Sequence, residues 1–185
     1  MDEIFTIDCD KVEEGIDLET VLLLNKAVTE PETVEEEYES WGKSARRLVE
    51  AISLSEDNEL EISREEDYFA TINENILGDL IHTQLRYECQ NNNDVVFLAS
   101  KIMEVIASSQ IFGEGNKRTA YLSGCLFLID YQLSVLGLEK AVIPVLDDEL
   151  IELLSDTAVG RSDANDLEKF FSGLRNDLSQ NIKDS

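Results

Sequence analysis

The sequence has few basic residues, and this scarcity limits the classes of partner that the protein can bind. It contains 40 acidic side chains but only 15 basic ones, which gives a formal net charge of -25. Contact with nucleic-acid phosphates needs clustered lysine and arginine. We therefore expect no direct binding to nucleic acid. The acid excess is spread along the whole chain, a pattern that a salt-rich cytoplasm tolerates; the alternative is simply an acidic protein.

Cysteine and histidine are also scarce. Cys9, Cys89 and Cys125 are widely spaced, and the chain has no CxxC pair and only one histidine, His82. This usage indicates neither a disulfide framework nor a zinc site. Three reduced, mostly buried thiols are the expectation, and a histidine beside Ile81 and Leu85 is more typical of a surface or structural residue than of a catalytic one.

Long apolar runs are missing as well. The most apolar stretch, residues 121–138, is interrupted by Asp130 and Gln132. Such a stretch is too polar to cross a bilayer, and the first residues lack the basic region of a signal peptide. We expect a soluble, cytoplasmic protein with no membrane partner.

What the sequence does contain is helical periodicity. With 185 residues and 43% hydrophobic content, the chain is long enough to bury one core, which favours a single domain over residues 1–185. Residues 4–7 look β-prone, in a first stretch that is typical of either a loose lead or an edge strand. The fold class predicted is therefore all-α, with an apolar helix near residues 117–128 buried at its centre. The other helices are expected at 16–30, 43–52, 63–87, 94–109, 147–160 and 163–174.

Polar residues capable of binding phosphate gather in the segment that joins two apolar helices, residues 111–119. Gly113 and Gly115 would let a phosphate approach the backbone, at the start of a helix whose free N–H groups favour an anion. Arg118 can grip phosphate oxygens, Asn116 can donate an amide hydrogen bond, and Glu114 can hold a bridging Mg²⁺. The segment is predicted to be a cradle for nucleotide phosphates.

This segment resembles the signature of the Fic/Doc family, His-x-Phe-x-(Asp/Glu)-(Gly/Ala)-Asn-(Gly/Lys)-Arg. The match extends from Gln110 to Arg118, and Lys117 makes it more similar to the Doc branch, while Tyr121 replaces the second arginine of the Fic branch. The resemblance implies a helical bundle with an opening helix at residues 16–30 and a motif-bearing core at 69–175. Residues 31–68 look like an insertion.

The resemblance also implies a function. Doc-like toxins of toxin–antitoxin pairs transfer a phosphoryl or AMP group from ATP or another nucleoside triphosphate, with Mg²⁺, to a hydroxyl of a host protein. A translation factor would be one such substrate, and an antitoxin would be a partner. In this chain Glu114 would hold Mg²⁺, Gly113, Gly115, Asn116 and Arg118 would bind the nucleotide, and Lys117 would orient it.

The chain departs from the signature at one position, where Gln110 replaces the family's catalytic histidine. A glutamine amide cannot accept a proton near neutral pH, so the general base is missing. Two origins remain open, an engineered knockout and a natural loss of transfer chemistry. The resemblance therefore implies an impaired transferase or, alternatively, a catalytically silent domain that binds nucleotide or protein.

Overall fold

The computed structural model describes residues 2–29 and 74–183. The segment interpreted as an insertion, residues 31–68, lies outside the described residues, as do the helices expected within it and the first residues of the core. The helical elements are η1 (Asp2–Phe5), η2 (Val12–Gly15), α1 (Leu18–Thr29), α3 (Glu74–Asp79), η5 (Leu80–Gln84), α4 (Leu85–Asn91), α5 (Val95–Ser108), α6 (Asn116–Asp130), η6 (Tyr131–Val135), α7 (Asp148–Ala158), α8 (Ala164–Phe170) and α9 (Ser172–Lys183).

The prediction of an all-α fold is confirmed. The described part of the chain is mostly helical and contains no strand, only one isolated bridge between Thr6 and Asp94. The edge strand expected at residues 4–7 does not form, because Asp2–Phe5 form the 3-10 helix η1. Only Thr6 and Ile7 pair with another segment, through the bridge to Asp94 and a bond from the Ile7 N–H to the Asn93 carbonyl at 3.0 Å. The Tyr131 hydroxyl lies within hydrogen-bond distance of the carbonyls of Ile4 and Thr6, at 2.7 and 3.0 Å. No described helix is long and apolar enough to cross a membrane.

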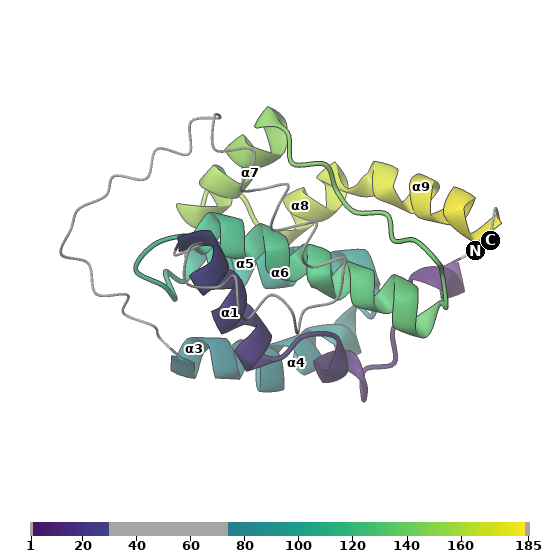
Figure 1. Cartoon of the computed structure of the whole chain (residues 1–185), viewed down its shortest axis with the longest axis horizontal. Helices are drawn as coiled ribbons and strands as arrows, with labels where there is room; N and C mark the ends of the chain where they lie inside the picture. The colour runs from purple at the N-terminus through teal and green to yellow at the C-terminus, as the bar shows by residue number, and fades with distance from the viewer. Residues whose placement is uncertain (1, 30–73, 184–185) are drawn as a thin grey trace.

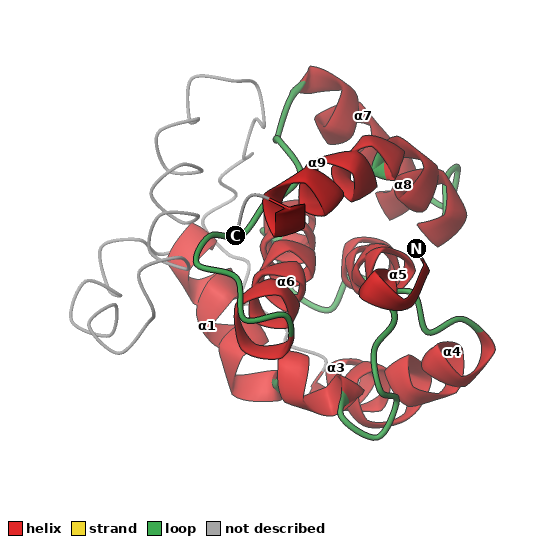
Figure 2. Cartoon of the chain, turned by 90° about the vertical axis from the view of Figure 1, so that its right-hand side faces the viewer, coloured by secondary structure: helices red, strands yellow, loops and turns green. Residues whose placement is uncertain are grey.

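Helices α5 and α6 lie side by side at the centre of the described fold, with α3 and α4 on one side and α7, α8 and α9 on the other (Figures 1 and 2). Nearly every residue from Thr119 to Ile129 is buried, as expected for a helix that is apolar all round. Gly124 lets the two helices approach closely, since a Cβ there would lie only 2.6 Å from Cγ of Met103. Helix α1 covers a further face of α6.

Aspartate side chains cap the starts of two of the expected helices. Asp94 accepts from the backbone N–H groups of Val96 and Phe97 at the start of α5, and Asp147 accepts from that of Leu150 at the start of α7. The closing helix differs from the prediction, because it breaks at Phe171, between α8 and α9. The turn at this residue buries the Phe171 ring, which packs edge-on against that of Phe170 at a centroid distance of 5.6 Å.

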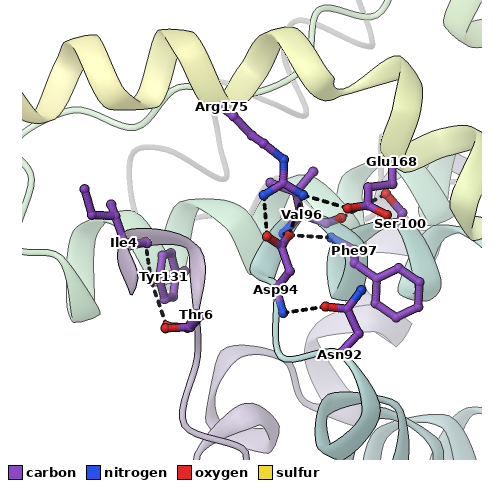
Figure 3. A network of polar contacts seen from close by, with 10 residues as sticks. All are labelled: Ile4, Thr6, Asn92, Asp94, Val96, Phe97, Ser100, Tyr131, Glu168 and Arg175. Carbon is purple, nitrogen blue, oxygen red and sulfur yellow. Dashed lines mark hydrogen bonds and ion pairs between the residues drawn. The ribbon is translucent and has the colours of Figure 1, made fainter. Parts of the chain in front are cut away.

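Arg175 of α9 contacts residues of three other elements, and Figure 3 shows its contacts with Asp94 and Glu168. Its guanidinium pairs with the Asp94 carboxylate and donates to Glu168 at 2.7 Å, and it lies over the Phe5 ring at 5.3 Å from the centroid. The hydrogen bond with Asp94 raises the pKa of Arg175 above its ordinary value. Because Asp94 also caps α5, this network joins the last helix, the central helix and the N-terminal segment.

The expectation of three reduced thiols is wrong. Cys9 and Cys89 form a disulfide although they are 80 residues apart, and among the described cysteines only the buried Cys125 is free. The pair meets because the N-terminal segment packs back along α4, where Arg86 also donates to Asp10 at 2.7 Å. This approach depends on tertiary packing, so the spacing of the cysteines along the sequence does not reveal it. Burial raises the pKa of the Cys125 thiol to about 12.

One buried hydroxyl of α6 provides a test of the packing. Ser123 is fully buried, and its Oγ has no hydrogen-bond partner among the described residues. We expect Ser123→Ala to raise the free energy of unfolding by about 1 kcal/mol, because an unsatisfied buried hydroxyl carries a desolvation cost. Urea denaturation measures the change.

The matched control is Ser100→Ala in α5. Ser100 is equally buried, but its hydroxyl donates to the Val96 carbonyl at 2.9 Å. Losing a satisfied hydrogen bond should lower the free energy of unfolding by about 0.5–1.5 kcal/mol. A loss of similar size in both variants would contradict the assignment of Ser123 as unsatisfied.

Candidate functional site

The loop between α5 and α6 adopts an unusual backbone at both ends. Gln110, just after α5, has φ of 45°, and Gly115, the residue before α6, has φ of 76°. Positive φ is routine for glycine but costs energy for glutamine. Non-glycine residues held in this region cluster at functional sites. Gln110 is therefore both the position where the family histidine would stand and a point of backbone strain.

This loop lines an open cleft with a volume of about 520 Å³. The cleft lies between the end of α5, the start of α6 and the end of α7. It brings together five of the predicted site residues: Gln110, Gly113, Gly115, Asn116 and Lys117. Its other walls are Ala107, Phe112, Ala158 and Val159. The volume falls within the range of about 300–1,000 Å³ that is typical of small-molecule sites.

Lys117 supplies the cleft with a positive charge. Its ammonium donates to the Ser155 hydroxyl of α7 at 3.3 Å, which uses one of its three N–H donors. The residue also lies in the first turn of α6, where backbone N–H groups have no partner within the helix. A cationic side chain and a helix N-terminus thus act together on one wall of the cleft.

Asn116 has a structural task that the sequence did not indicate. Its Oδ1 accepts from the Phe112 N–H at 3.0 Å, and its Nδ2 donates to the Phe112 carbonyl at 2.7 Å. The side-chain amide therefore closes the loop on itself. The donor predicted to bind a phosphate is already engaged in this arrangement.

Two predicted residues do not line the cleft. Arg118 instead donates from Nη1 to the Val28 carbonyl at the end of α1, at 3.3 Å, and borders a much smaller cavity of about 10 Å³. Glu114 is exposed at the tip of the loop. Within the described residues no group of three acidic, histidine or cysteine side chains is placed to hold a metal ion. One carboxylate together with substrate phosphates is nonetheless a common way to bind Mg²⁺.

Tyr121 is buried next to the motif residues. Its hydroxyl donates to the Pro144 carbonyl at 2.7 Å, and burial raises its pKa well above the ordinary value. It therefore stays neutral and secures the segment before α7. His82 lies away from the cleft, with its side chain 64% exposed and Nδ1 3.4 Å from a Glu13 carboxylate oxygen. The interpretation of His82 as a surface residue agrees with this position.

Sequence reasoning missed Asn25 and Ser155. Asn25 of α1 is 5% exposed and donates from Nδ2 to the Glu114 carbonyl at 2.9 Å and to the Thr119 hydroxyl at 3.1 Å. A signal for it was available, because Asn25 falls at helical spacing from Leu18 and Val21 on the apolar face. No comparable signal marks Ser155, which comes directly after Leu153 and Leu154 in α7 and does not interrupt an apolar face.

A scan against protein-family models found no match for this chain. Searches of curated proteins and of solved structures found no similar protein either. The assignment to the Fic/Doc family therefore stays a prediction that depends on the motif residues.

Proposed function

We propose that this chain is a Doc-like domain that binds a nucleoside triphosphate with Mg²⁺ in the cleft at the start of α6. Transfer of a phosphoryl or AMP group to a protein hydroxyl would be impaired by Gln110. The observation that carries the proposal is that Gln110, Gly113 and Lys117 line one cleft of about 520 Å³. Five of the seven predicted site residues thus line a space that suits a small molecule.

Each residue would have a defined task in this proposal. Lys117 and the N-terminus of α6 would bind phosphate oxygens, and Gly113 would leave the backbone open to them. Mg²⁺ would neutralise phosphate charge, and Glu114 at the loop tip is the carboxylate nearest in sequence to hold it. Arg118 and Asn116 support this binding indirectly in the present arrangement, because both are bonded to backbone carbonyls.

Titration calorimetry with Mg²⁺–ATP tests the proposal. The wild-type protein should bind, and Lys117→Ala should weaken binding by about 1.5–3 kcal/mol, the usual contribution of a hydrogen bond to a charged group. Circular dichroism checks that both proteins are folded.

Ser155→Ala is the matched control. It removes the hydroxyl that Lys117 contacts at 3.3 Å but keeps the ammonium in the cleft. Its affinity for Mg²⁺–ATP should stay close to that of the wild type. A folded wild-type protein that shows no heat of binding with ATP or other nucleoside triphosphates would refute the proposal.

A silent binding module is the second candidate, and Gln110 favours it. A domain without a general base can still bind nucleotide or a partner protein, since binding needs no proton transfer. The two candidates differ in turnover: the impaired transferase should label protein slowly with ATP labelled at the α or γ phosphate, whereas the silent module should bind ATP without labelling any protein.

A further inference from the structure

The C-terminal turn of α1 contacts the motif loop at several points. Helix α1 ends at Thr29, beside the loop that joins α5 to α6 (Figure 1). Asn25 donates to the carbonyl of Glu114, and Arg118 donates to the carbonyl of Val28. These bonds connect residues about 90 positions apart in the chain.

The loop backbone fits against α1 without space to spare. A Cβ on Gly115 would lie 2.8 Å from Cγ2 of Thr29 and 3.0 Å from Nδ2 of Asn25. The absence of a side chain at Gly115 thus allows the loop to rest directly on α1. The glycine that the sequence assigned to phosphate approach also serves this packing.

Asn25 is the buried polar residue within this contact. It is 5% exposed, and its one amide nitrogen serves both the loop carbonyl at 2.9 Å and the Thr119 hydroxyl in the first turn of α6 at 3.1 Å. It therefore bridges the last part of the loop and the start of the helix. The position of the loop relative to the start of α6 determines the direction of the Lys117 ammonium and of the free N–H groups of α6.

We infer that Asn25 is a positioning residue for the nucleotide cleft: it does not line the cleft but fixes the loop and the first turn of α6 in the arrangement that binds phosphate. This inference rests on the proposed function. Loss of the Nδ2 donor leaves the Glu114 carbonyl without its partner and frees the loop to take other arrangements. Apparent affinity then falls with the fraction of molecules that keep the binding arrangement.

Asn25→Asp is the sharpest variant, because it keeps the shape of the side chain but replaces the donor with an oxygen that repels the Glu114 carbonyl. If the loop is correctly placed only about a tenth of the time, Kd for Mg²⁺–ATP should rise about tenfold. Backbone amide exchange of Phe112 and Thr119, whose N–H groups donate to Asn116 Oδ1 and to the Gly115 carbonyl, should become faster in the same variant when followed by NMR. Asn25→Ala, which removes the amide without adding a charge, should change both quantities in the same direction and replaces Asn25→Asp where the charged variant does not fold.

Gln132→Glu is the control for a purely structural role. Gln132 lies in η6, directly after the end of α6 that is farther from the cleft. It is 1% exposed and donates from Nε2 to the carbonyls of Leu128 and Val142, at 3.0 and 2.7 Å. Like Asn25→Asp, the Gln132→Glu variant replaces a buried amide with an acid and should lower the free energy of unfolding. Its amide hydrogen exchange in the loop and its Kd for Mg²⁺–ATP should match those of the wild type.

The two readouts separate the inference from the proposed function. Faster loop exchange in the Asn25 variants, but not in Gln132→Glu, supports the positioning role even where no protein binds ATP. Equal loop exchange in all variants overturns the inference. Faster loop exchange with an unchanged Kd also overturns it, because the loop would then be ordered by Asn25 without any consequence for the cleft.

Discussion

Reduction of the disulfide between Cys9 and Cys89 is expected to lower the free energy of unfolding by about 4–5 kcal/mol in the chain-entropy model of cross-linking. The size follows from the sequence separation of 80 residues, because a long closed loop restricts the unfolded chain strongly. Native proteins have free energies of unfolding of about 5–15 kcal/mol, so the disulfide would supply a large share of the stability of this protein. Urea denaturation with and without dithiothreitol measures it, and thiol titration verifies that the bond is reduced.

The control is the double variant Cys9→Ser and Cys89→Ser, which should unfold at the same urea concentration with and without reductant. Cys125 remains in this variant, so any effect of reductant on the buried thiol would appear there. A wild-type protein whose unfolding midpoint does not move after verified reduction would contradict the expected contribution of the cross-link.

The helical framework was predictable from the sequence because its signals are local. Asp94, Asp147 and Asp163 stand directly before apolar-periodic segments, and each accepts backbone N–H groups at a helix start. The break at Phe171 has a weaker local signal, the Ser172–Gly173 dipeptide that follows it, and the apolar spacing continues across this signal to Leu174.

Proximity within the motif could be predicted from the sequence, but the directions of its side chains could not. Gln110, Gly113 and Lys117 line one cleft, because neighbouring residues of a short loop must lie near one another. The direction of Arg118 depends on the end of α1, about 90 residues away, and its contact with Val28 has no local cause. Asn25 was missed for the same reason: a polar residue on an apolar face shows that a partner exists, but not which one.

Replacement of Gln110 by histidine is expected to raise the rate of group transfer by about 10²–10⁴, the usual contribution of a positioned general base. Gln110 is exposed on the cleft, so an imidazole there meets an incoming hydroxyl without repacking of the core. Its φ of 45° suits the exchange, because histidine is found in the left-handed region more often than most residues. An imidazole titrates near neutral pH and takes the hydroxyl proton that an amide cannot.

Transfer of label from ATP to protein in a cell lysate measures this gain, with ATP labelled at the α or the γ phosphate in separate reactions to distinguish AMP from phosphoryl transfer. Gln110→Asn is the matched control, since asparagine tolerates the same backbone conformation but remains an amide. It should label protein no faster than the wild type.

The gain should also depend on Lys117, the residue proposed to bind phosphate. Adding Lys117→Ala to Gln110→His should abolish most of the labelling, because base and phosphate clamp act as one unit and their losses are not additive. Growth of cells that express Gln110→His should slow, and that of cells with the double variant should not. A folded Gln110→His protein that binds Mg²⁺–ATP but labels nothing would mean that more than the base has been lost, and the silent binding module would then be the better description of the domain.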